Sequence, residues 1–220
     1  MNSDDALLAR LRLMDTASLS DANKALPVLT SAIRPLVPGL RMAGRAVTAR
    51  ANDDLMSVIG ALEISGPGDV LVVAAGDRNE AVVGELFGTE AFRRGLAGIV
   101  IDGMSRDTAA LRRLGLPIYS RGVTPKAPAA VRVPEIQLTL TIDGVEVRPG
   151  DLLVGDDDGI IVGSVTDFAA IIDAAEAIQT REKALRTSIE RGSSLFDAMN
   201  FTDHVARLRA GEPTRLAFET

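Results

Sequence analysis

The sequence predicts an α/β fold in which buried strands alternate with helices. Residues 70–75 and 97–101 are continuous apolar runs of strand length, which is typical of strands covered on both faces. Between them, residues 80–94 carry apolar side chains at helical spacing, and residues 117–120 are expected to form a further strand. Residues 69–120 therefore alternate strand, helix, strand, helix, strand, as an α/β unit does.

The segment before this unit is expected to begin with helix. Residues 4–36 have a helical pattern, with candidate N-cap residues near Ser20. Residues 39–51 are expected to form a strand with glycine interruptions. The run Asn52-Asp53-Asp54 can cap a helix that continues to about Ile64.

Turn signals dominate the stretch that follows the α/β unit. Residues 137–142 and 145–147 alternate around Asp143-Gly144, which predicts a β-hairpin. Pro67-Gly68-Asp69 and Pro149-Gly150-Asp151 each precede an apolar strand. We interpret this repetition as one turn used twice, not as an internal duplication.

The C-terminal segment is expected to be helical from about Thr166. No linker or low-complexity run divides the chain, so we expect one domain over residues 1–220 with a C-terminal helical extension from about 166. Such a helix packs on its own sheet or on a neighbouring subunit, and the sequence leaves both open. Five apolar residues share one face of it: Phe168, Ile171, Ile172, Ala175 and Ile178.

The composition excludes several kinds of chemistry. The chain has no cysteine and one histidine, His204, so a thiol nucleophile, a thiolate metal site and a multi-histidine zinc site are ruled out within one chain. A net charge of −6 and the absence of tryptophan disfavour nucleic acid as a partner. No apolar run approaches ~20 residues and the acidic start is unlike a signal peptide, so we expect a cytoplasmic protein with no membrane partner.

Some polar residues favour a structural interpretation over a functional one. His204 is expected at the surface or at an interface. The run Asp156-Asp157-Asp158 lacks the glycine and glutamate spacing of a helix–loop–helix calcium site, and a solvated turn is expected there instead.

Two loops at the expected carboxyl ends of strands concentrate glycine and charge. Ligands in open α/β sheets bind at these ends. One loop covers residues 76–85 and the other residues 102–107, which include Arg106 and Asp107. Residues 86–105, one helix plus one strand, separate Glu85 from Arg106, so the two loops are expected side by side at one edge of the sheet.

Backbone amides at the start of the helix can hold a substrate carboxylate. The N–H groups around Gly84, Leu86 and Phe87 are available if the helix begins close to them. If it begins near Glu80, those amides are already bonded within the helix. Taken alone, Glu85 has the character of a solvated helix carboxylate.

The available side chains favour chemistry through an enolate. Retro-aldol cleavage and β-decarboxylation of oxo acids both place negative charge on a former keto oxygen. A Lewis-acidic metal on Asp107 beside the Arg106 guanidinium can stabilise that charge. Mg²⁺ commonly uses only one or two carboxylates and keeps several waters. Lys126 offers the alternative of a Schiff base.

Glu85 followed by 20 residues and Arg106-Asp107 resembles the acid-X20-Arg-Asp signature of the 4-hydroxy-4-methyl-2-oxoglutarate aldolase family. That family also contains the regulator-of-ribonuclease-activity-A-like (RraA-like) proteins. The resemblance covers about residues 15–165. It includes Leu19-Ser20-Asp21-Ala22, Asn52-Asp53-Asp54-Leu55, Gly68-Asp69-Val70-Leu71-Val72-Val73, residues 95–103 and Leu116-Pro117-Ile118-Tyr119-Ser120.

The resemblance implies a layered α/β/β/α sandwich with a β-barrel-like core, similar to phosphohistidine swivelling domains. It implies a class II aldolase that cleaves 4-hydroxy-4-methyl-2-oxoglutarate or 4-carboxy-4-hydroxy-2-oxoadipate, with oxaloacetate decarboxylase activity. Asp107 would bind Mg²⁺ or Mn²⁺, partly through waters, and Arg106 would contact the keto oxygen. Glu85 would order the metal waters and the base, and amides near Leu86 and Phe87 would hold the pyruvate carboxylate.

The same resemblance implies a homotrimer or homohexamer, with an acidic residue of a neighbouring chain completing the site. It also leaves an alternative, because the family includes non-catalytic regulators that bind ribonuclease E. Methyltransferase activity, a third label attached to the family, is disfavoured because no glycine-rich loop follows the first strand.

Overall fold

The computed structural model describes residues 3–29, 31–76 and 79–218. The chain divides into two units, Met1–Ile172 and Asp173–Thr220, of which the first contains the sheet. Within the described residues, no helix combines the length and the apolar character needed to cross a membrane.

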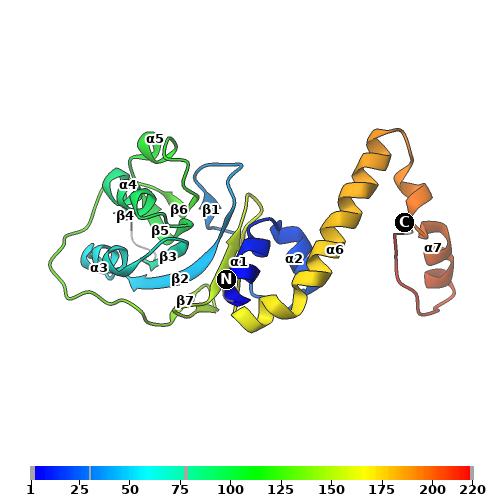
Figure 1. Cartoon of the computed structure of the whole chain (residues 1–220), viewed down its shortest axis with the longest axis horizontal. Helices are drawn as coiled ribbons and strands as arrows, with labels where there is room; N and C mark the ends of the chain where they lie inside the picture. Colours follow the sequence, from blue (N-terminus) through cyan, green and yellow to red (C-terminus); the bar gives the residue numbers. More distant parts are fainter. Residues whose placement is uncertain (1–2, 30, 77–78, 219–220) are drawn as a thin grey trace. The chain divides into compact units, whose positions relative to one another are not determined.

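A mixed sheet organises the first unit (Figure 1). Its strands follow the order β1-β6-β5-β3-β2-β9-β10, with β4 paired to β5 outside this path. The strands β2, β3, β5 and β6 are parallel, as is β4 beside β5, whereas β1, β9 and β10 join antiparallel. The strands are β1 (Arg34–Pro35), β2 (Met42–Arg50), β3 (Asp69–Ala74), β4 (Ala81–Val83), β5 (Gly98–Ser105), β6 (Ile118–Val123), β9 (Leu152–Gly155) and β10 (Ile160–Gly163).

The central strands are apolar throughout because both faces of the sheet are covered. In β3, Leu71 and Val73 belong to one core cluster while Val70 and Val72 belong to the other. Successive side chains of a strand point to opposite faces, so a strand buried on both sides needs an unbroken apolar run. The sequence-based prediction of buried strands at 70–75 and 97–101 is confirmed.

Helices cover one face of the sheet and a β-hairpin covers the other. The helices α3 (Met56–Ile64), α4 (Glu85–Arg93) and α5 (Thr108–Leu111) contribute to the first cluster. The hairpin of β7 (Leu140–Ile142) and β8 (Val145–Val147) contributes to the second. Figure 1 shows α3 and α4 beside the central strands. The sheet curls into a half-barrel, and the predicted layered α/β fold is confirmed.

Tight turns form the tip of the β7–β8 hairpin and lead into β3 and β9. Asp143 and Gly144 both have positive φ, 45° and 84°, as a two-residue hairpin turn of type I′ requires. Gly68 and Gly150 share a φ of 85°, and Asp69 and Asp151 each accept a backbone N–H three residues upstream at 2.8 Å. The two Pro-Gly-Asp segments therefore form the same turn, as predicted.

The N-terminal prediction was partly wrong. Residues 4–36 do not form continuous helix but contain α1 (Ser3–Leu11) and α2 (Thr16–Ala22), followed by turns and β1. The N-cap of α2 is Asp15, whose Oδ1 accepts the Ser18 N–H at 2.7 Å, not a residue near Ser20. An N-cap side chain accepts the backbone N–H three residues further along, and this bond fixes where the first turn of the helix begins.

Two boundaries near the predicted site also differ. The expected helix over residues 80–94 is divided into β4 and then α4, which begins at Glu85. The expected loop over residues 102–107 is mostly strand, because β5 continues to Ser105. Both differences have one cause: β4 pairs with the end of β5 through Met104 and Ser105.

The second unit is helical. Helix α6 (Val165–Glu190) begins in the first unit, close to the predicted start at Thr166, and continues into the second. The 3₁₀ helix η1 (Leu195–Ala198) and α7 (Phe201–Arg209) follow.

Candidate active site

The ends of β4 and β5 bring the predicted site residues together. Val83 O accepts the Arg106 N–H at 3.0 Å, which fixes the end of β5 beside the start of α4. The Glu85 N–H donates to Asp107 Oδ2 at 3.0 Å. All six predicted residues line one small pocket: Gly84, Glu85, Leu86, Phe87, Arg106 and Asp107, together with Leu55, Ala81 and Val82.

Gly84 is required by close approach. A Cβ on this residue would lie 2.5 Å from Asp107 Oδ2 and 2.9 Å from Arg106 Cγ, which is closer than atoms can pack. Gly84 is also the N-cap of α4, and its carbonyl accepts the Gly88 N–H at 2.9 Å. The absent side chain lets the Asp107 carboxylate reach the first turn of the helix.

The first turn of α4 presents free amide donors to this pocket. Because α4 begins at Glu85, the N–H groups of Leu86 and Phe87 have no partner within the helix. They also have no hydrogen-bond partner elsewhere among the described residues. Together with the helix dipole, such amides favour a bound anion.

Arg106 and Asp107 place a cation and a carboxylate side by side. Arg106 Nε lies 3.6 Å from Asp107 Oδ2, and the two side chains are 39% and 43% exposed. Asp107 has a φ of 56°, a left-handed conformation that aspartate adopts more readily than most residues. Its carbonyl accepts the N–H groups of Ala110 and Leu111, so the backbone that starts α5 also holds this side chain at the pocket.

A second hollow of about 300 Å³ adjoins the same pair of residues. It is lined by Arg106, Asp107, Thr108, Val123, Thr124 and Pro125. Neither Thr108 nor Thr124 was among the predicted site residues. The signal that could have found Thr124 is the carboxyl end of β6, which reaches Val123 and not Ser120 as expected.

The loop after β6 is tied to β4. Lys126 O accepts the Ala81 N–H at 2.7 Å, and Lys126 Nζ lies 2.8 Å from Glu80 Oε1. Lys126 is therefore held in an ion pair, and it does not line the pocket that contains Arg106 and Asp107.

Asp54 fixes the wall of the pocket that contains Leu55. Its Oδ2 accepts the N–H groups of Val131 and Arg132 at 2.6 and 3.1 Å, and its Oδ1 accepts that of Met56 at 2.8 Å. Burial opposes the charged form, but these backbone hydrogen bonds outweigh it and lower the pKa of Asp54 below its ordinary value of 3.8. This carboxylate therefore supports the site and stays charged.

The donor set fits a hydrated hard cation better than a fully enclosed one. Among the described residues, no three His, Cys, Asp or Glu side chains gather closely enough to hold a metal ion. Asp107 offers one half-exposed carboxylate, and the backbone N–H that this carboxylate accepts belongs to Glu85, whose own side chain is a second carboxylate close by in the chain. One or two carboxylates with several waters is an arrangement that Mg²⁺ accepts.

The other polar candidates have structural partners. Asp156 binds the N–H and Oγ1 of Thr16 at 2.8 and 2.7 Å, and Asp157 accepts the Gly39 N–H. His204 Nδ1 lies 3.1 Å from Thr214 Oγ1. The aspartate run thus forms a turn, as predicted, but Asp156 is buried and hydrogen-bonded and not solvated.

Comparison with known proteins identifies the family. The family profile described as "RraA-like: Aldolase/RraA" matches residues 16–162. The chain belongs to the Aldolase/RraA family. The profile match ends before α6, whereas the alignments with individual relatives cover more of the chain and include part of α6.

Individual proteins match over most of the chain. A protein of Halalkalibacterium halodurans, provisionally named a 4-hydroxy-4-methyl-2-oxoglutarate aldolase, is 35% identical over 83% of this chain and 88% of its own length. An uncharacterized protein of Pseudomonas syringae pv. tomato has a similar structure, with a TM-score of 0.78, 29% identity and coverage of 88% and 96% of the two chains. Streptomyces coelicolor RraAS2 is described as an unusual member of the RNase ES inhibitor RraA protein family. Its structure matches with a TM-score of 0.75 and 30% identity, over 85% of this chain and 100% of its own.

Proposed function

We propose that this protein is a divalent-metal-dependent pyruvate aldolase that cleaves 4-hydroxy-4-methyl-2-oxoglutarate or 4-carboxy-4-hydroxy-2-oxoadipate and also decarboxylates oxaloacetate. The observation that carries the proposal is the pocket in which Arg106 and Asp107 face the free amides of α4. The name of the H. halodurans relative supports the aldolase class.

The pocket suits a 2-oxo acid because it offers one set of donors for the carboxylate, the amides of α4, and another for the keto oxygen, the Arg106 guanidinium. The N–H groups of Leu86 and Phe87 bind the carboxylate of the pyruvate moiety at the positive end of the helix dipole. The Arg106 guanidinium binds the keto oxygen and stabilises the negative charge that develops there as the carbon–carbon bond breaks. The amides are fixed before substrate arrives, because the backbone around Gly84 is hydrogen-bonded, and the Arg106 N–H bond to Val83 O holds the backbone of Arg106 beside them.

Asp107 is the proposed ligand of Mg²⁺ or Mn²⁺, and a bound metal would supply a Lewis acid beside the same keto oxygen. Glu85 lies at the mouth of the pocket with an exposed side chain. Its carboxylate can order waters around Asp107 and help remove the proton of the substrate hydroxyl. Arg106 and Glu85 are thus the proposed catalytic residues, while Gly84, Leu86 and Phe87 shape the substrate site.

The proposed setting is a cytoplasmic homotrimer or homohexamer that has no nucleic-acid or membrane partner. The pocket is small, about 60 Å³, and open to solvent on one chain. An acidic residue from a neighbouring subunit would enclose it and complete the base.

A coupled assay of pyruvate release tests the proposal. Oxaloacetate and the two hydroxy-oxo diacids are each supplied with Mg²⁺, with Mn²⁺ and with chelator. We expect turnover that chelator abolishes and that either metal restores, and a loss of at least about 10²-fold in kcat/KM for Arg106→Ala and Asp107→Ala. Arg112→Ala, at the exposed C-cap residue of α5 and outside both hollows, serves as the control and should keep full activity. Turnover that persists in chelator, or in both site variants, contradicts the mechanism.

The alternative is a non-catalytic regulator that binds ribonuclease E. The likeness to S. coelicolor RraAS2, whose description names RNase ES inhibition, favours this reading. A binding regulator does not need the free amides of α4 or the charge pair. Inhibition of ribonuclease E by the wild type and by Asp107→Ala alike, without pyruvate release by either, would establish the alternative.

A further inference from the structure

Arg106 and Asp107 line two hollows of very different size. The pocket at the start of α4, here named the α4 pocket, has a volume of about 60 Å³, whereas the second hollow has about 300 Å³. Protein sites for small ligands commonly have volumes of roughly 300–1,000 Å³. The α4 pocket alone is therefore too small for a whole hydroxy-oxo diacid, while the two hollows together are large enough.

The shared pair of residues determines which part of a substrate enters the second hollow. If the α4 amides hold the pyruvate carboxylate and Arg106 holds the keto oxygen, as proposed above, the C3–C4 bond that breaks lies beside Arg106 and Asp107. The substituents on C4 then need space beyond the α4 pocket. The second hollow is the other space that the same two residues line.

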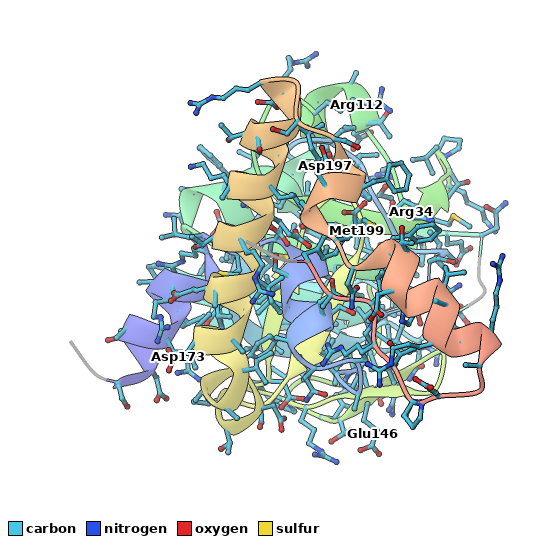
Figure 2. The ribbon with its side chains drawn as sticks, turned by 90° about the vertical axis from the view of Figure 1, so that its right-hand side faces the viewer. Arg34, Arg112, Glu146, Asp173, Asp197 and Met199 are labelled. Atoms are coloured by element: carbon cyan, nitrogen blue, oxygen red, sulfur yellow. The ribbon has the colours of Figure 1, made fainter. Side chains whose placement is uncertain are left out.

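Two threonines in the lining are held by regular backbone structure. Thr108 is the first residue of α5, the short helix whose C-cap residue, Arg112, is labelled in Figure 2. Thr124 directly follows β6, and its N–H donates to Ser105 O at the end of β5 at 3.0 Å. Both side chains are therefore fixed beside the residues that carry the proposed chemistry.

The hydroxyls of these threonines are available to a ligand. Thr108 and Thr124 are half-buried, and neither hydroxyl forms a hydrogen bond within the part of the chain that the structure describes. Each hydroxyl can donate one hydrogen bond. Two such donors near a guanidinium suit a carboxylate, and both hydroxy-oxo diacids carry a carboxylate on C4.

The rest of the lining is apolar. Val123 and Pro125 offer no side-chain donor, and proline also lacks a backbone N–H. Among the described lining residues, Arg106 is the one cation and Asp107 the one anion. Lys126, the next residue of the loop, lies outside the lining and is held in its ion pair. This part of the hollow therefore favours an apolar group over a second carboxylate, because a charge placed there without a partner costs free energy.

We infer that the second hollow binds the C4 end of the substrate, with Thr108 and Thr124 on the C4 carboxylate and Val123 and Pro125 against the remaining C4 substituent. This role rests on the proposed function. Cleavage moves the electron pair of the C3–C4 bond to C3 and the proton of the C4 hydroxyl to the base, so C4 becomes the keto carbon of a second oxo acid.

The hollow therefore selects between the two proposed aldol substrates. The remaining C4 substituent is a methyl group in 4-hydroxy-4-methyl-2-oxoglutarate, here called the 4-methyl substrate. It is a carboxymethyl group in 4-carboxy-4-hydroxy-2-oxoadipate, here called the 4-carboxymethyl substrate. The apolar wall of Val123 and Pro125 favours the 4-methyl substrate, whose kcat/KM should be at least about threefold higher.

Pyruvate release from three substrates tests the threonines. In Thr108→Val with Thr124→Val, kcat/KM for both aldol substrates should fall about tenfold or more, while that for oxaloacetate should stay within about twofold. Oxaloacetate carries no carboxylate on C4, because its C4 is itself the carboxylate carbon that leaves as CO₂. Thr108→Ser with Thr124→Ser keeps both hydroxyls and should retain aldol cleavage within about twofold. Thr141→Val, on the exposed side of β7, is the control.

Val123→Lys tests the apolar wall in the opposite direction. The Val123 side chain is 57% exposed, so a lysine can be accommodated there, and its ammonium would pair with the added carboxylate of the 4-carboxymethyl substrate. We expect the ratio of kcat/KM for the 4-carboxymethyl over the 4-methyl substrate to rise by about threefold, as for a partly exposed ion pair. Val131→Lys adds the same charge outside the hollow and should leave this ratio unchanged.

Failure of this role can be told apart from failure of the proposed function. A wild type that releases no pyruvate from any of the three substrates would overturn both. A wild type that turns over all three but prefers the 4-carboxymethyl substrate would overturn the role of the hollow alone. The same holds if the valine variant loses oxaloacetate turnover as strongly as aldol cleavage, or if Val123→Lys leaves the substrate ratio unchanged. Thermal melts by circular dichroism check that every variant is folded.

Discussion

At the scale of single residues, the candidate site depends on backbone conformations that few side chains tolerate. Asp107 is held at positive φ, and Gly84 faces it across a gap that excludes even a methyl group. These two positions set the relation between a carboxylate, a guanidinium and a helix N-terminus. Small changes there should alter activity far more than stability.

Gly84→Ala should reduce kcat/KM for pyruvate release by about 10²-fold. The added Cβ would displace the Asp107 carboxylate and the Arg106 side chain, and misplacement on the order of 1 Å can have that effect. Gly66→Ala is the matched control, because its Cβ would meet nothing closer than Asp69 Oδ2 at 3.8 Å. Steady-state kinetics of both variants checks this, and equal activities would show that Gly84 is not needed to hold the pair.

Glu85→Asp should retain activity within about tenfold, whereas Glu85→Ala should lose more than that. The shorter acid keeps the charge at the first turn of α4 but withdraws it by one methylene, which changes where an ordered water lies. The ratio of kcat/KM for the two hydroxy-oxo diacids should therefore shift in Glu85→Asp. An alanine variant with wild-type kinetics would leave Glu85 as a solvated helix carboxylate.

At the scale of elements, the sequence was informative wherever local pattern and tertiary role agree. The apolar runs of β3 and β5 and the Asp143-Gly144 turn could be predicted because burial on two faces and positive φ have direct sequence signatures. The proximity of Glu85 to Arg106 could be predicted because loops at the carboxyl ends of neighbouring parallel strands lie at the same edge of the sheet. The boundary at Gly84 did not follow, because Ala81–Val83 becomes a strand only through pairing with β5.

The contact between Asp54, just before α3, and the loop over residues 129–136 could not be predicted either, because Asp54 is separated from Val131 by 76 intervening residues. Nothing local distinguishes Asp54 from its neighbours Asn52 and Asp53. The second hollow, lined by Thr108 and Thr124, was missed for a related reason: the end of β6 depends on its register with β5.

Asp54→Asn should lower the melting temperature at pH 7 by several degrees, because the amide cannot accept all three N–H groups. The lowered pKa of Asp54 means that the unfolded chain binds its proton more readily than the folded one. Its stabilisation is thus present above pH 3.8 and is lost as pH falls through the folded-state pKa.

Thermal melts between pH 7 and pH 3 check this dependence. The difference in melting temperature between wild type and Asp54→Asn should shrink as the pH falls. Glu63→Gln, an exposed acid on α3, which begins two residues after Asp54, is the control and should follow the wild type. A difference that stays constant down to pH 3 would contradict the role assigned to the Asp54 charge.

At the scale of the whole molecule, the two units differ in how they are stabilised. The first unit holds both core clusters described above, the candidate site and all of the residues that the family profile matches. The second unit has exposed apolar side chains and lies beyond the family match. Stability of the first unit should therefore depend little on protein concentration, whereas the conformation of the second should depend on it.

Hydrogen exchange at different protein concentrations should separate the two units. Amides of β3 and β5 are buried in both core clusters, so their exchange should be slow at any concentration. Amides around Leu185 and Ile189 should exchange slowly in the assembled protein and much faster after dilution below the dissociation constant, because binding protects them only by mass action. Exchange that stays slow at these positions after dilution would mean that the distal part of α6 is covered within its own chain.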